Sequence, residues 1–295
     1  MSTTLPDLVV TRPTHDLRPI LVSIPHAGCR VPEDEIALYA QSPEELTADG
    51  DLFVDRLYEG ASELGVTVVQ TTISRFVIDL NRFEDDLHPS AVEGAAAIHR
   101  EGYLGKRGLI WAVNTRGEPV YHAPLTRAAL ARRLGRYYHP YHAALRDELR
   151  ALRERFGFAL LLDAHSMPSR ATALHPDALA LRPDVVPGDL DGQSCAPWVA
   201  ETTRRYWEER GLSVVPNHPY RGGAITRLHH APGEGVHAVQ LELNRALYMD
   251  EVSRSPHAGL ARLREQCLGW VAALAREVDA RATLAAPVAA EPEGG

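Results

Sequence analysis

Short apolar runs of strand length recur along most of the chain and are separated by polar or helical segments. Runs that are rich in leucine or β-branched residues and bounded by glycine, proline or polar residues predict buried strands. We expect strands at residues 20–24, 65–70, 158–163, 212–215 and 237–245. Apolar residues at helical spacing predict helices at residues 51–64, 125–156, 196–211 and 255–286. Strands that alternate with helices in this way are typical of an α/β fold.

The remaining segments have the composition of connections. Residues 1–17 are polar and contain prolines, so we expect a loosely held entry segment, and residues 287–295 should form a disordered tail. Residues 83–120 are loop-rich, which fits either a lid or an ordinary surface connection, and residues 169–191 are irregular. Pro140 interrupts or divides the helical pattern around it. A length of 295 residues is ample for one core, and we expect a single domain over residues 1–295.

Charge and composition exclude several classes of protein. The net charge is −8 with a pI near 6.0 and mixed charge signs, so we expect no nucleic-acid partner. No apolar run approaches the roughly 18 residues of a membrane span, and the first residues lack the pattern of a secretion signal. The scattered Cys29, Cys195 and Cys267 make a disulfide framework improbable. We therefore expect a soluble cytoplasmic protein that acts on a small molecule.

Two predicted strands are each followed by a histidine. His26 follows the run 20–24, and His165 follows the run 158–163. A single histidine after a strand is more often structural, but two at strand ends favour a metal site, because imidazole is the commonest metal ligand. Zinc sites often add one carboxylate to two histidines, and we favour Asp51 as that ligand, with Asp55 as the second choice. The alternative for Asp51 is a helix N-cap.

Glu242 is a charged residue between two leucines of the last predicted strand. A buried carboxylate costs several kcal/mol unless it is paired or functional, so we favour a functional role over pairing with His237 or Arg245. The histidines in polar or helical surroundings are expected at the surface: His99, His139, His142, His175 and His257. His122 is an isolated polar residue for which we expect no function.

Arginine, asparagine and glycine residues are candidates for substrate binding. A strand-like run at residues 71–82 carries Arg75 at one end and Asn81 with Arg82 at the other. The planar guanidinium suits bidentate capture of a carboxylate, although Arg82 could instead pair with Asp79. Further along, Asn217, Gly223 and Arg227 belong to a loop that either clasps a ligand or is a flexible turn.

These residues together suggest metal-assisted hydrolysis of an anionic substrate. A metal at His26, Asp51 and His165 would polarise the scissile carbonyl and acidify water, with Glu242 as general base. Zinc suits two imidazoles and one carboxylate, and cobalt or manganese could substitute. A serine hydrolase that uses Ser166 is a poor alternative, because the chain has no G-x-S-x-G motif.

Six blocks of the chain resemble those of N-formylglutamate amidohydrolases and occur in the order of that family. They lie at residues 23–28, 51–58, 74–82, 163–166, 222–227 and 239–243. The resemblance implies a three-layer α/β/α fold with a mixed sheet, related to zinc carboxypeptidases (phosphorylase/hydrolase-like). It also implies hydrolysis of N-formyl-L-glutamate to formate and L-glutamate, as in histidine degradation.

Carried over by position, His26, Asp51 and His165 look like the metal ligands of the family and Glu242 like its general base. Asn81 and Arg82 resemble the pair that holds a terminal carboxylate in related carboxypeptidases. The resemblance is weakest at residues 83–124, where a substrate-facing loop could lie. The alternatives are a zinc hydrolase of another N-acyl acidic amino acid or small peptide, and a metal- or ligand-binding protein without turnover.

Overall fold

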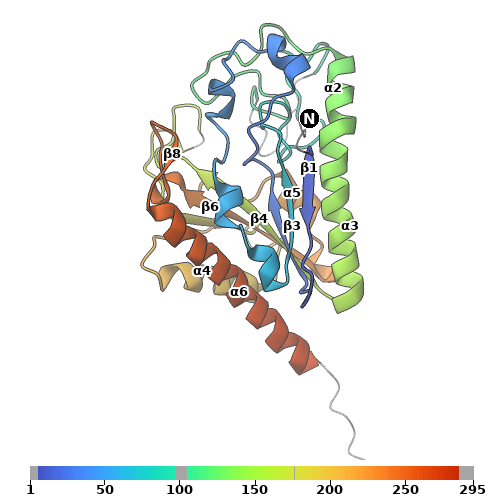
Figure 1. Ribbon diagram of the computed structural model, residues 1–295, viewed down its shortest axis with the longest axis vertical. Helices are drawn as coiled ribbons and strands as arrows, with labels where there is room; N and C mark the ends of the chain where they lie inside the picture. The colour runs from blue at the N-terminus through green and yellow to red at the C-terminus, as the bar shows by residue number, and fades with distance from the viewer. Residues whose placement is uncertain (1–5, 97–104, 176, 286–295) are drawn as a thin grey trace, which may run out of the picture.

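The apolar runs form a six-stranded mixed sheet in the computed structural model, which describes residues 6–96, 105–175 and 177–285 (Figure 1). In the order in which they pair, its strands are β1 (Leu8–Thr11), β3 (Thr67–Thr71), β2 (Ile20–Ile24), β4 (Ala159–Met167), β6 (Val236–Asn244) and β5 (Val185–Gly188). Strands β3, β2, β4 and β6 run parallel, whereas β1 and β5 pair antiparallel at the two edges.

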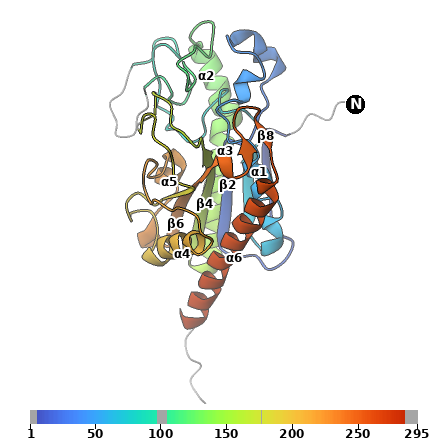
Figure 2. The ribbon, with the colours of Figure 1, turned by 90° about the vertical axis from the view of Figure 1, so that its left-hand side faces the viewer.

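Helices cover both faces of this sheet, so the predicted three-layer α/β/α fold with a mixed sheet is confirmed (Figure 2). One face packs against α2 (Arg127–Arg133), the π-helical turn η4 (Leu134–Tyr138) and α3 (His139–Phe156). The other face packs against α1 (Val54–Leu57), α4 (Pro197–Glu208) and α6 (Gly259–Ala285).

Each strand contributes alternate side chains to the two cores. Leu160, Leu162 and Ala164 of β4 lie in the core under α6, whereas Leu161 lies in the core under α3. Successive side chains of a strand point to opposite faces, so His165 faces the α3 layer. The glycine predicted to end the long helix does so: Gly157 adopts a left-handed conformation with φ of 70° directly after α3.

Shorter elements connect the layers. They are η1 (Glu33–Leu38), η2 (Glu45–Thr47), η3 (Ala61–Leu64), α5 (Ala224–Leu228), η5 (Pro232–Glu234), η6 (Arg245–Leu247) and the hairpin of β7 (Met249–Asp250) with β8 (Ser255–Pro256).

Three predictions near the sheet edges were wrong. The supposed entry segment contains β1, because residues 8–11 extend the ladder of β3. The irregular stretch 169–191 contains β5, which pairs with β6. In contrast, residues 212–215 make only an isolated bridge from Val214 to Val185. Edge strands are short and pair on one side only, so their local pattern is weak.

Two local predictions also need correction. The helix expected at 51–64 is reduced to α1 and η3, because Phe53 and Gly60 have positive φ. The run 71–82 leaves the sheet after Thr71. The prediction for Pro140 is confirmed: the helical segment is divided there, because η4 ends at Tyr138 and Pro140 lies in the first turn of α3, where its missing N–H is tolerated.

Two further expectations have limited tests. The predicted tail at 287–295 lies outside the described residues. Within the part of the chain that is described, no helix is both long and apolar enough to cross a membrane.

Candidate metal centre

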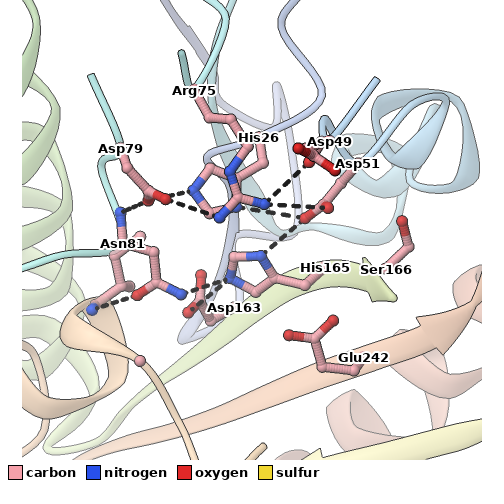
Figure 3. Close-up of polar contacts among 12 residues, drawn as sticks. His26, Asp49, Asp51, Arg75, Asp79, Asn81, Asp163, His165, Ser166 and Glu242 are labelled. Carbon is pink, nitrogen blue, oxygen red and sulfur yellow. Dashed lines mark hydrogen bonds and ion pairs between the residues drawn. The ribbon is translucent and has the colours of Figure 1, made fainter. Parts of the chain in front are cut away.

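Polar side chains converge where β2, β4 and β6 reach their carboxyl ends (Figure 3). His26 lies two residues after the end of β2, His165 lies two residues before the end of β4, and Glu242 lies two residues before the end of β6. The parallel register pairs His165 with Glu242, so their side chains are neighbours on the same face of the sheet. Strand ends of an α/β sheet are the usual place for a ligand crevice.

His26, Asp51 and His165 form a buried group whose potential ligand atoms all lie within 4.8 Å of one another. Asp51 Oδ2 is 3.4 Å from His26 Nδ1 and 3.0 Å from His165 Nδ1. Zinc–ligand distances of about 2.0–2.1 Å in a tetrahedron place donor atoms roughly 3.3 Å apart, which these separations match. Asp51 is brought there by its N–H, which donates to His26 O at 2.9 Å. The alternative ligand, Asp55, is exposed elsewhere.

Each histidine has a carboxylate on its other ring nitrogen. Asp79 Oδ1 lies 2.7 Å from His26 Nε2, and Asp163 Oδ2 lies 3.1 Å from His165 Nε2. Asp79 accepts the proton on Nε2 of His26 and leaves the Nδ1 lone pair of that ring pointing at the shared centre. The Nε2 of His165 lies beside Asp163 and also 3.1 Å from Nδ2 of Asn81. His26 Nδ1 is buried without a hydrogen-bond partner among the described residues. This orphaned atom and the carboxylate–histidine pairs fit a metal ion.

The electrostatics of the centre also favour a cation. Burial alone would lower the pKa of His165, but Asp163 and Asp51 outweigh it and raise that pKa well above its usual value. Burial alone would raise the pKa of Asp51, yet His165 and His26 hold it well below its ordinary range. The pKa of Asp79 is likewise held low, against burial, by Arg75 and by other nearby positive groups. Carboxylates therefore stay ionised around the two imidazoles.

Arg75 and Arg245 form ion pairs with Asp79 and Asp51 and offset their negative charge. Arg245 Nη2 donates to Asp51 Oδ1 at 2.9 Å, and Arg75 Nη2 donates to Asp79 Oδ2 at 2.7 Å. Arg75 also stacks on Trp111. Arg75 lines the cavity while its terminal nitrogens contact Asp79 and the Asp49 carbonyl, and its role as a substrate ligand stays a prediction.

Glu242 is 7 % exposed and faces the same cavity as the two histidines. Burial raises its pKa to about 7, with His165 opposing and Asp51 adding to the shift. A carboxyl group with a pKa near neutrality is suited to taking and giving a proton at physiological pH.

A cavity of about 360 Å³ opens in front of the centre. Its cationic lining includes Arg82, Arg107 and Arg227. Arg82 donates to the carbonyl oxygens of Arg107 and Asn81, and it remains 3.9 Å from Asp79. The side chain of Arg227 forms no hydrogen bond or ion pair with the described residues, so its guanidinium is available to an anionic ligand.

The other predicted binding residues divide into two kinds. Asn81 and Gly223 line the cavity, although Asn81 Oδ1 already accepts the N–H of Ile225 at 2.8 Å. Asn217 does not line it, which corrects the prediction. Its side chain instead binds Asp189, donating from Nδ2 to Oδ1 at 2.7 Å, and so fixes the turn after β5.

The histidines expected at the surface also divide. His139 and His257 are exposed, as is His122, and His99 lies outside the described residues. His175 is half-buried and lines the cavity. His142 is buried, which corrects the prediction: it lies on the inner face of α3, against the loop at Leu80.

The structure adds residues that the sequence did not single out as part of the site. Asp163 and Gln240 could have been found, because each lies two residues before a candidate on the same face of its strand. Asp79, Trp111 and Arg245 gave no such signal, because they reach the centre through long-range packing. Ser166 accepts from Tyr248 and Arg245 and has no histidine partner in these contacts.

Comparisons with known proteins agree on one family. The family model of N-formylglutamate amidohydrolase matches residues 18–249. An N-formylglutamate deformylase of Pseudomonas putida is 40% identical over 240 residues, covering 79% of this chain and 82% of that one. A deformylase of the same name from Pseudomonas aeruginosa is 34% identical over 266 residues, covering 85% and 93%.

A solved structure is similar over nearly the whole chain. The N-formylglutamate amidohydrolase of Ralstonia eutropha JMP134 superimposes with a TM-score of 0.85 at 31% identity, covering 94% of this chain and 100% of that chain.

Proposed function

The chain belongs to the N-formylglutamate amidohydrolase family, and from this premise we propose that it hydrolyses N-formyl-L-glutamate to formate and L-glutamate. The observation that carries the proposal is the convergence of two histidines and an aspartate, all buried, beside a glutamate in one cavity. That arrangement supplies a metal-binding group and a base at the same sheet edge, as hydrolysis of an amide requires.

We propose zinc as the resident metal, held by Nδ1 of His26, Nδ1 of His165 and the Asp51 carboxylate. Two imidazoles and one carboxylate form a common catalytic zinc set, and cobalt or manganese could occupy the same donors. When bound, such a cation polarises an amide carbonyl and lowers the pKa of a neighbouring water molecule. Asp79 would keep His26 in the tautomer that binds a metal, and the Asp163 carboxylate beside the other ring nitrogen of His165 would raise the basicity of that imidazole.

Glu242 would act as the general base and then as the general acid. Its carboxylate takes a proton from the attacking water while the water oxygen forms a bond to the formyl carbon. The carbon–nitrogen bond then breaks, its electron pair stays on nitrogen, and Glu242 returns the proton to that nitrogen. The immediate products are formic acid and the amine of glutamate, the base is restored, and transfer of the acid proton to the amine gives formate and the ammonium form of glutamate.

Arg82 and Arg227 would hold the negative charges of the substrate. Both guanidiniums line the cavity, and that of Arg227 is without a partner among the described residues. A bidentate guanidinium–carboxylate contact is both strong and directional. Two such cations on the cavity wall fit a small anionic amino-acid derivative better than a neutral one.

The test combines metal analysis with a formate-release assay on the purified protein. We expect zinc in near one-to-one amount, loss of activity on chelation, and recovery when zinc is returned. Glu242→Gln should retain the metal and lose about 10²–10⁴-fold in kcat. Glu201→Gln, on the exposed side of α4, is the matched control and should match wild type.

The outcomes separate the rivals. Faster turnover of acetyl, carbamoyl or peptide analogues than of the formyl compound would assign the same chemistry to another substrate. Metal binding without turnover of any of these compounds would leave a binding protein and overturn the proposal.

A further inference from the structure

Gln240 lies beside Glu242 on β6 and makes hydrogen bonds both to Glu242 and to Gly223, which directly precedes α5. It is two residues before Glu242 on β6, faces the same cavity, and is 3 % exposed. Its Nε2 donates to Glu242 Oε1 at 3.0 Å, and its Oε1 accepts the N–H of Gly223 at 2.8 Å. The contact with Gln240 is the one hydrogen bond that the Glu242 side chain makes with the described residues.

The orientation of the Gln240 amide is determined by its partners. The N–H of Gly223 can only donate, so the oxygen of the amide must face it. The Nδ2 of Asn81 is a second donor near that oxygen, at 3.4 Å. The amide nitrogen is thereby turned toward Glu242, where it can only donate. Because the Gln240 amide is fixed, its hydrogen bond favours one rotamer of the buried Glu242 side chain over the others.

We propose that Gln240 is a positioning residue, which holds the carboxylate of Glu242 toward the reacting atoms and ties it to the loop that carries Gly223. This inference rests on the proposed function, because it assigns a role to Gln240 through Glu242. Gln240 itself touches neither the metal-binding atoms nor, in this assignment, the substrate.

The hydrogen bonds of Gln240 connect Glu242 with the segment that carries Arg227, one of the proposed substrate-binding residues. Gly223 directly precedes α5, which carries Arg227. Gly223 also packs so closely on Asn81 that a Cβ at this position would lie 2.3 Å from the Asn81 side chain. The backbone at Gly223 therefore has a fixed position against β6. Because Gln240 connects Glu242 to Gly223, the Glu242 carboxylate keeps a fixed distance from the part of the cavity wall that carries Arg227.

The effect expected on removal of these hydrogen bonds is a loss of rate. A misplacement of a reacting group by about 1 Å can lower the rate by roughly 10²-fold. Gln240→Met has a similar length and shape but neither donates nor accepts. We expect it to lower kcat by about 10–100-fold, to leave KM within about threefold, and to leave the metal content at the wild-type value.

A double-mutant cycle distinguishes positioning from a general structural role. In the background of Glu242→Gln, measured at high enzyme concentration, Gln240→Met should lower the remaining rate by less than about twofold. The two effects are then non-additive, because the residue that Gln240 positions no longer acts as a base. An equal loss in both backgrounds would overturn the proposal, as would a wild-type kcat for Gln240→Met.

Two further measurements keep the test decisive. If Gln240→Met fails to fold, Gln240→Asn keeps an amide that is one methylene shorter and cannot reach both partners, and it should show the same cycle. Crystal structures of wild type and variant need no activity, and they should show the Glu242 carboxylate displaced in the variant. An unmoved carboxylate overturns the inference, whereas a wild-type protein that releases no formate overturns only the proposed function.

Discussion

Replacing the buried His142 should change how the stability of the fold depends on pH. Its Nε2 lies 3.0 Å from the carbonyl oxygen of Leu80, and its Nδ1 lies 2.8 Å from Nε2 of His229. The two rings lie edge to edge and nearly coplanar, with their centroids 5.2 Å apart and an interplanar angle of 9°. Since Leu80 O can only accept, His142 carries its proton on Nε2, and His229 donates to its Nδ1. This arrangement holds both rings neutral.

The size of the effect follows from the pKa of His142. Burial is the main cause that lowers the pKa of His142 from its ordinary 6.5 to about 4. The hydrogen bond to Leu80 and the charge of Asp163 raise this pKa, whereas His139 and Arg146 lower it further. The unfolded chain therefore binds the proton first, so stability is complete above about pH 6.5 and declines as the pH falls toward about 4. With these two values, the loss from His142 alone between about pH 7.5 and pH 5 is about 2 kcal/mol.

The assay is urea unfolding of wild type and His142→Gln at several pH values in that range. Wild type should lose about 2 kcal/mol more unfolding free energy than the variant on acidification. His122→Gln, at an exposed position, is the control and should follow the wild-type curve. Parallel curves for wild type and His142→Gln would refute the reasoning, because a neutral buried His142 must contribute this difference.

Three further predictions test other contacts. Asp163→Asn should weaken zinc binding by about 10–100-fold in a competition titration, because it removes the negative charge 3.1 Å from the outer ring nitrogen of His165; an unchanged affinity would contradict the assignment. Gly223→Ala should lower kcat/KM at least about tenfold, because the added Cβ would meet the Asn81 side chain. Gly233→Ala is the control and should leave kcat/KM unchanged, because a Cβ there has open space. Equal effects of the two substitutions would argue against the close packing at Gly223. Thr126→Ala should lower the free energy of unfolding by about 1 kcal/mol, since Thr126 Oγ1 caps α2 by accepting the N–H of Ala129 at 3.1 Å; no change would mean that the cap is not made in solution.

The parts of the fold that could be predicted are those with a strong local pattern. The continuous apolar runs of β2, β4 and β6 mark strands that are buried on both faces. The polar residues at their carboxyl ends were correctly expected at one sheet edge. Parallel strands put those ends at the same edge of the sheet, and the adjacent order β2-β4-β6 makes them neighbours.

The parts that could not be predicted depend on distant partners. β1 exists because β3 offers it a ladder, and β5 because β6 does. The residues 74–82 form no regular element, and their conformation is set by partners such as Leu109, whose oxygen accepts the N–H of Asp79 at 2.9 Å. His142 is a polar residue in the helical sequence of α3, which suggests a surface position. It is buried because the loop at Leu80 packs on it.

The sequence by itself determined the strand runs, the face that each side chain takes on its strand, and the residue types that can bind a metal and move a proton. These are properties of neighbouring residues, and a period of two along a strand is enough to express them. Only the tertiary structure decided that Asp51 rather than Asp55 lies with the histidines, that Asp79 and Asp163 lie beside their outer ring nitrogens, and that Arg75 pairs with carboxylates whereas the Arg227 side chain pairs with no described residue. Those outcomes depend on which loops cross the sheet edge, and contacts between residues far apart in the chain leave no local periodicity from which to predict them.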